Sequence, residues 1–182
     1  FYASKQGSNS SIFRSTTGDA GSWTDLILAK IGLDSNTNKT QRVEAAVAPS
    51  DPNTVYALLY QDTTTYTRNG VTANSKVTIY SSNNGGTSFN RVNRPEDADS
   101  SGIPIPDFTR FQGWYDLILK VDPNNSQVVY AGGIDIFKST DGGVHWSQMT
   151  HWYGGFSKQY AHADQHGMAF EGTNSDVMYY TN

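Results

Sequence analysis

The feature that most limits the fold of this chain is the ten-residue sequence Phe-Lys-Ser-Thr-Asp-Gly-Gly-Val-His-Trp at residues 137–146. Asp141 can accept hydrogen bonds from N–H groups of a turn, and Gly142 and Gly143 can adopt positive φ at no steric cost. Trp146 follows the turn at a point where it can return to an apolar layer. The sequence therefore predicts a β-hairpin that is closed by a tight turn.

The same pattern occurs twice more along the chain. Residues 80–89 repeat it, with Asn84 at the position of the aspartate and Phe89 at the position of the tryptophan. Residues 13–23 are a looser copy that is one residue longer. Recurrence of one hairpin at this spacing is typical of propellers and solenoids.

A second repeated hairpin lies upstream of the first in each unit. Residues 47–57 match residues 121–131, and residues 170–180 are a partial copy. Each reads as a strand, a turn rich in Pro, Asn and Asp, and a further strand. One unit therefore contains two hairpins, or four strands, which is the content of one propeller blade.

These hairpins carry a resemblance to a known repeat. The S-x-D-x-G-x-x-W spacing of Ser139, Asp141, Gly143 and Trp146 resembles the Asp-box, or BNR, repeat, and the related positions in the other clear copy are Ser82, Asn84, Gly86 and Phe89. Asp-box repeats occur in sialidases, xyloglucanase-like glycosidases, sortilin-type receptors and secreted bacterial propellers. Residues 160–166 look like a segment of the large secreted BNR-like proteins of Bacteroidetes. The resemblance implies an all-β propeller and leaves the activity open.

We therefore expect an all-β fold, a β-propeller of four-stranded antiparallel blades. The predicted units are a partial first blade at 1–30, a second blade at 41–93, a third at 113–150 and the start of a fourth at 162–182. The Asn69-Gly70 pair predicts a tight turn inside the second blade. Closed propellers have about 4–8 blades, so about three blades indicate a piece of a larger propeller. An open, solenoid-like stack is the alternative.

Composition excludes several classes of protein. The net charge is −4 with scattered basic residues, which does not resemble a nucleic-acid surface. The sequence lacks an apolar run of the ~18 residues that a membrane span needs. The absence of cysteine excludes a disulfide framework. Abundant Tyr, Trp, Ser, Thr and Asn suit an extracellular or bacterial cell-surface β protein.

The order of strands within a blade predicts where a ligand would bind. Both kinds of short turn fall at one end of the blades, and the longer connections at 61–75, 93–112 and 151–161 fall at the opposite end. Binding residues concentrate in elaborated loops on rigid scaffolds. We therefore expect the functional site at the end with the longer connections.

Aromatic and charged residues cluster at that predicted end. The ligand-binding candidates are Arg42, Trp114, Tyr115, Trp152 and Tyr153, and the catalytic candidates are Asp116 and Glu44. Aromatic rings, an arginine and carboxylates are what sugar recognition or glycosidic cleavage would use. The alternative is structural: the aromatic residues pack between blades or plug the third blade, and the charged pair is a solvated rim.

His162, Asp164 and His166 form the most compact polar group. Alternate residues of a strand share a face, so a strand here would point all three side chains the same way. Imidazole and carboxylate at this spacing could bind a divalent metal. The favoured interpretation is a buried His–Asp hydrogen-bond network, and no other cofactor is expected.

Three function classes remain open. The first, which we favour, is a secreted binding or scaffolding module for glycans or protein partners, joined to further blades of a longer chain. The second is a glycoside hydrolase, xyloglucanase-like or sialidase-like, with catalytic carboxylates partly in other blades. The chain has no Arg-Ile-Pro signature, and its six arginines are scattered. The third is a sortilin-like, peptide-binding propeller.

Overall fold

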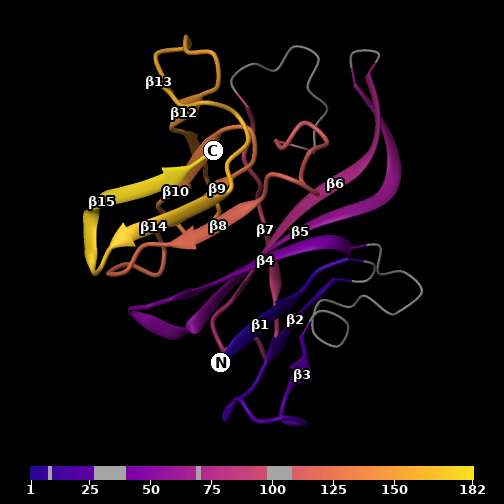
Figure 1. Ribbon diagram of the computed structural model, residues 1–182, viewed down its shortest axis with the longest axis vertical. Coiled ribbons are helices and arrows are strands. Elements are labelled where there is room, and N and C mark those ends of the chain that lie inside the picture. Colours follow the sequence, from indigo (N-terminus) through magenta and orange to yellow (C-terminus); the bar gives the residue numbers. More distant parts are fainter. Residues whose placement is uncertain (8–9, 27–39, 69–70, 98–107) are drawn as a thin grey trace.

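The computed structural model describes residues 1–7, 10–26, 40–68, 71–97 and 108–182 (Figure 1). These residues form fifteen β-strands and no helix, so the all-β prediction is confirmed for this part of the chain. It follows that the described part holds no helix that could cross a membrane. The predicted Asn69-Gly70 turn lies outside the described residues, although the strands on either side of it pair up to Arg68 and Val71.

Three sheets are antiparallel, and within each of them neighbouring strands are consecutive in the chain. The first contains β1 (Tyr2–Lys5), β2 (Ser11–Arg14) and β3 (Thr24–Asp25). The second contains β4 (Thr40–Ala48), β5 (Asp51–Arg68), β6 (Val71–Ser82) and β7 (Asn90–Val92). The third contains β8 (Ile118–Val121), β9 (Val129–Gly132), β10 (Ile136–Ser139) and β11 (Ser147–Gln148).

Two pairs of strands complete the chain. The short strands β12 (Thr150–His151) and β13 (Gln159–Tyr160) pair in parallel and close the loop between them. The hairpin of β14 (Gly167–Glu171) and β15 (Asn174–Thr181) follows. β14 contacts β8, which also contacts β4. The innermost strands therefore lie side by side, and the sheets form a partial β-propeller.

The middle sheet is buried on both faces because successive apolar side chains of β5 point to opposite faces of the sheet. Ala57 and Leu59 pack toward the first sheet in a cluster with Ile12. Tyr56 and Leu58 point to the other face and join the larger core of the third sheet. A period of two places alternate residues on opposite faces, so one strand contributes to two separate cores. The blades are consequently held together by apolar packing as well as by their shared row of inner strands.

The repeated turns use their serine and acidic or amide side chains as predicted. Ser139 Oγ accepts the N–H of Gly143 at 2.8 Å and donates to Asp141 Oδ1 at 2.8 Å. Asp141 Oδ1 also accepts the N–H of His145 at 2.8 Å. The equivalent bonds of the other turn join Ser82 to Gly86 at 2.9 Å, Ser82 to Asn84 at 2.9 Å and Asn84 to the N–H of Ser88 at 2.9 Å. The two turns are therefore chemically equivalent.

Trp146 is predicted to return to an apolar layer, but its side chain is less buried than that prediction implies. It is only half-buried, and its indole N–H donates to the carbonyl of Asn93 at 3.0 Å. Asn93 also donates its backbone N–H to the carbonyl of Gly143 at 3.0 Å. The ring therefore lies over the junction between the second and third sheets, where protein covers one side of it only.

Both kinds of turn lie at the same end of the sheets, as the strand order predicts. The N–H of Gly85 donates to the carbonyl of Asn53 at 2.8 Å, and the N–H of Gly142 donates to the carbonyl of Gln127 at 2.9 Å. Each bond joins one turn of a blade to the other. Figure 1 shows the β4–β5, β8–β9 and β14–β15 turns at the left, whereas β5 and β6 rise to the top right.

Asp141 gives a testable dependence of stability on pH. Hydrogen bonds from the backbone and side chain of His145 lower the pKa of Asp141 from 3.8 to about 2. The ionised carboxylate therefore stabilises the fold above the ordinary pKa, and this contribution is lost as the pH falls through about 2. We expect the melting temperatures of wild type and Asp141→Asn to differ most above pH 4 and to converge toward pH 2. Asn84 shows that an amide fits this turn, and a gap that stays constant over this range would contradict the assignment.

Candidate ligand-binding face

The end opposite the short turns, here called the loop end, consists of Asp97 and residues 108–117, 132–135 and 152–166. It holds all the described non-glycine residues with positive φ, which are Arg110 (50°), Phe111 (69°), Phe156 (53°), Ser157 (56°) and Asp164 (71°). Such conformations are uncommon outside glycine and concentrate at functional sites. Backbone strain is therefore concentrated at the end where the sequence predicts the site.

Trp114 and Tyr115 form an exposed aromatic pair, here called the inner platform, in the turns that precede β8. Their exposed fractions are 61% and 46%, and their ring centroids lie 5.5 Å apart. The edge of the Tyr115 ring meets the His166 ring at 4.6 Å. The third blade is predicted to begin at residue 113, but its innermost strand begins only at Ile118. Turns suit exposed rings better than a strand would, because an inner strand is covered by its neighbouring blades.

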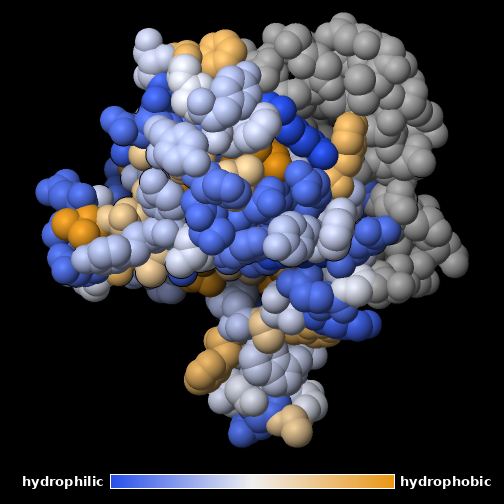
Figure 2. Space-filling view, turned by 45° about the horizontal axis from the view of Figure 1, so that its top comes forward, coloured by the Kyte–Doolittle hydropathy of each residue, from blue (hydrophilic) through white to orange (hydrophobic). Residues whose placement is uncertain are grey.

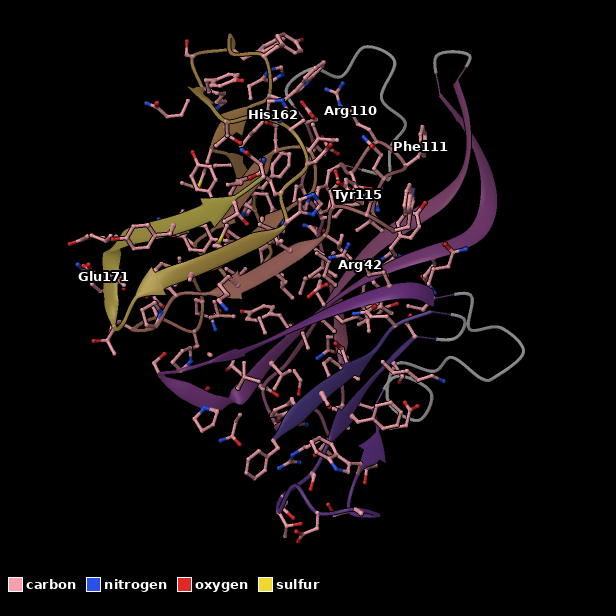
Figure 3. The ribbon with its side chains drawn as sticks, in the orientation of Figure 1. Arg42, Arg110, Phe111, Tyr115, His162 and Glu171 are labelled. Carbon is pink, nitrogen blue, oxygen red and sulfur yellow. The ribbon has the colours of Figure 1, made fainter. Side chains whose placement is uncertain are left out.

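Arg42 holds this platform in place. Its guanidinium donates to the carbonyl oxygens of Tyr115, Trp114 and Leu117, the last at 2.9 Å. It also donates to Glu44 Oε1 at 3.1 Å. Figure 3 shows Tyr115 above Arg42, near the centre of the view. Arg42, which the sequence predicts as a ligand contact, therefore acts on the backbone that carries the aromatic rings.

Neither catalytic candidate from the sequence presents an open carboxylate. Asp116 is fully buried. Glu44 is paired with Arg42, and although burial raises the pKa of Glu44, the charge and hydrogen bond of Arg42 oppose this shift. A substrate at the surface would therefore meet aromatic rings rather than a pair of acids.

A second aromatic group, here called the outer platform, lies in the loop between β12 and β13. Trp152, Tyr153 and Phe156 are exposed by 37%, 52% and 50%. The rings of Trp152 and Tyr153 meet at 4.7 Å with an interplanar angle of 83°, and the Arg110 guanidinium lies 5.5 Å from the Trp152 ring centroid. Figure 2, which brings the top of Figure 1 forward, shows a mainly hydrophilic or pale surface with separate hydrophobic residues.

His151 lies beneath the outer platform and is completely buried. Its ring meets Tyr153 at 4.2 Å and Phe156 at 4.8 Å between centroids. Asp97, Asp135 and His151 form a group whose nearest ligand atoms all lie within 4.8 Å of one another. This buried group joins three segments that are far apart in the sequence.

Polar neighbours surround the two carboxylates of that group. The Gln148 amide donates to Asp135 Oδ2 at 3.3 Å and to Asp97 Oδ1 at 3.5 Å, and Thr150 Oγ1 donates to Asp135 Oδ1 at 3.3 Å. Arg110 pairs with Asp97 Oδ2 at 3.4 Å. Burial and, next, the Asp97 carboxylate raise the pKa of Asp135 to about 7, although Thr150, Arg110 and Gln148 each lower it.

The structure does not bring His162, Asp164 and His166 together in a strand. β14 begins only at Gly167, and Asp164 has positive φ, so the prediction of a shared strand face was wrong. The His162 ring contacts the carbonyl of Ala163 at 3.2 Å, and His166 contacts Tyr115. The group with metal-ligand geometry among the described residues is the one at Asp97, Asp135 and His151.

A glutamine fixes the segment that carries those three residues. Gln165 is fully buried, and its amide donates to the carbonyl of His162 at 2.6 Å and to that of Ile134 at 3.3 Å. Its backbone N–H donates to the carbonyl of Gly133 at 2.8 Å. The segment before β14 is therefore attached to the turn that carries Asp135.

Sequence reasoning missed Asp97, Arg110, Asp135 and Gln148. The signal available for Asp135 is an aspartate two residues after the Gly132-Gly133 pair, in a short connection at the loop end. The other three have no local signal, because the group is assembled from separate segments of the chain.

Comparison with known proteins gives likeness in structure only. No family model matches the chain, and no curated protein matches it either. A GH74 xyloglucanase from Xanthomonas campestris is 24% identical with a TM-score of 0.46 over 80% of this chain, which spans 18% of that protein. YCF48 bound to D1 peptide is 12% identical with a TM-score of 0.47 over 82% of this chain, which spans 37% of that protein. Neither likeness bears on the activity of this chain.

Proposed function

We propose that this chain is part of a propeller that binds a carbohydrate chain at its loop end. The observation that carries the proposal is the inner platform: Trp114 and Tyr115 are exposed, yet their backbone is fixed by Arg42. Aromatic rings usually lie inside a protein or against a ligand. Rings that are held rigidly toward solvent lose little conformational entropy when a flat sugar face stacks on them.

The outer platform supports the same proposal. Trp152 and Tyr153 stand almost perpendicular to each other, and Arg110 beside them can donate hydrogen bonds to hydroxyl groups. A ligand that combines apolar faces with many hydroxyl groups suits such a surface. A protein ligand is the second candidate, and the binding experiment below separates the two.

We further propose that the chain is an Asp-box propeller that works outside the cell or on a bacterial cell surface. The serine, aspartate or asparagine and glycine bonds of the two turns support the first part of this proposal. The composition of the chain, which is rich in tyrosine, tryptophan and small polar residues, supports the second part.

A glycoside hydrolase is less well supported by the described residues. Hydrolysis needs two carboxyl groups on either side of a glycosidic bond, about 5–10 Å apart. Asp116, Asp135 and Asp97 are almost completely buried, and Glu44 is paired with Arg42. Binding without cleavage is therefore the function that we propose.

Affinity electrophoresis would test the proposal with gels that contain xyloglucan, mixed-linkage glucan, xylan, galactomannan or polygalacturonate. We expect at least one polysaccharide to retard the protein, and Trp114→Ala to weaken that binding about 10-fold or more, as for a central aromatic contact. Tyr179→Ala is the matched control, because Tyr179 is a 58% exposed ring on β15, away from the loop end. Equal retardation of Trp114→Ala and wild type would contradict the assignment of the inner platform.

A further inference from the structure

The buried imidazole of His151 is the observation that calls for an explanation. The side chain is fully buried, and within the described part of the chain neither Nδ1 nor Nε2 has a hydrogen-bond partner. A buried polar atom without a partner is costly and rare in native proteins. The rings of Tyr153 and Phe156 cover the imidazole, so they shield it from water without satisfying it.

Two carboxylates lie where they could share a ligand with this imidazole. One ligand atom from each of Asp97, Asp135 and His151 lies within 4.8 Å of the other two. The contacts of the carboxylates with Gln148, Thr150 and Arg110 are long, between 3.3 and 3.5 Å. Such contacts are weak for charged groups, whose hydrogen bonds are usually 2.7–2.9 Å long.

We propose that Asp97, Asp135 and His151 bind one divalent transition-metal ion. An imidazole nitrogen with two carboxylate oxygens suits zinc or manganese better than calcium or magnesium, which favour oxygen ligands alone. The ion would form one bond with the unpartnered imidazole and one with each of the two closely spaced carboxylates. Three protein ligands leave a further position for water or for an oxygen of a bound molecule.

The hydrogen bonds that surround the two carboxylates are typical of those around metal ligands. The Gln148 side chain donates to both carboxylates and to the carbonyl of Thr150, at 2.9 Å for the last bond. Partners of this kind orient metal-binding carboxylates. Arg110 faces Asp97 and would remain as a partner for the second oxygen of Asp97.

The position of the site gives the ion a structural role. Asp97 belongs to the connection before β8, Asp135 to the turn between β9 and β10, and His151 to β12. One ion would therefore join β12 and the connection before β8 to the β9–β10 turn of the third sheet, and would fix the outer platform from below. The site is buried beneath the outer platform, but metal binding and the melting temperature are measured without a sugar, so its test does not depend on sugar binding.

The experiment is a titration of the chelator-treated protein with ZnCl₂ and, separately, MnCl₂. We expect one ion to bind per chain and the melting temperature to rise, because a ligand that binds only the folded state stabilises it. Asp135→Asn keeps the shape of the side chain and removes its charge, and we expect it to weaken binding about 10-fold or more. His162→Ala, which removes an exposed histidine outside the group, should bind like wild type.

The proposal is overturned if neither ion binds to wild type or raises its melting temperature, or if Asp135→Asn binds as tightly as wild type. A loss of binding in His162→Ala would also overturn it, because the ion would then lie at another histidine. If Asp135→Asn does not fold, X-ray absorption of the zinc-loaded wild type decides. We expect one imidazole nitrogen and oxygen ligands at about 2.0–2.2 Å, and a shell without imidazole would contradict the site.

Discussion

Replacing Phe137 by alanine is expected to lower the free energy of unfolding by about 3–5 kcal/mol. Phe137 is completely buried in the core between the second and third sheets. Its ring meets the Phe108 ring at 5.4 Å in an edge-to-face arrangement. Removal of the ring leaves a cavity at the point where two blades and the segment before β8 meet, so little of the lost packing can be recovered.

Urea unfolding measures this effect, and Val144→Ala is the control. Val144 lies in the same hairpin and is 50% exposed. Surface substitutions of this kind usually change stability by less than about 0.5 kcal/mol. A loss below about 1 kcal/mol for Phe137→Ala would show that the blades are not joined by the core described above.

Gly113→Ala is expected to destabilise the protein by about 1–3 kcal/mol, as overpacking does. A Cβ atom at this position would lie 2.4 Å from Cδ2 of Tyr60 and 3.0 Å from Oγ1 of Thr109. Tyr60 is buried, and its hydroxyl donates to the carbonyl of Phe111 at 3.2 Å, so its ring cannot move freely. The adjoining turn carries Trp114, and we therefore expect polysaccharide binding to weaken as well.

A double-mutant cycle with Tyr60→Leu tests this mechanism. The smaller side chain removes the ring that the new methyl group meets, so the two changes should cost less together than their sum, by about 0.5–3 kcal/mol. Strict additivity would show that the glycine is required for a reason other than its approach to Tyr60.

The turns and the blade could be predicted from sequence because their causes are local. Ser139, Asp141 and Gly143 act within a few residues of one another, and their pattern recurs as Ser82, Asn84 and Gly86. Alternation of apolar residues then predicts strands that pack on both faces. The end of the blades at which the longer connections lie follows from the strand order alone.

The site residues could be predicted only in part. The predicted end does carry the exposed aromatic residues Trp114, Tyr115, Trp152 and Tyr153. The exposure of the inner platform, however, depends on its contact with Arg42, which is distant in the sequence. The spacing of His162, Asp164 and His166 indicated a strand face, yet the attachment of Gln165 to another turn overrides that periodicity. The group of Asp97, Asp135 and His151 depends on tertiary contacts from the outset.

We propose that the loop end is the ligand-binding face. The four tryptophans allow a direct test, because Trp114 and Trp152 lie at the loop end, whereas Trp23 and Trp146 belong to the hairpins at the opposite end. The measurement is a ¹⁹F NMR titration of the 5-fluorotryptophan-labelled protein with the polysaccharide that retards it most, with each resonance assigned by a Trp→Phe variant. We predict that the Trp114 resonance shifts or broadens, with or without that of Trp152, while those of Trp23 and Trp146 stay unchanged. Changes confined to Trp23 or Trp146 would contradict the claim and place the ligand at the other end of the blades.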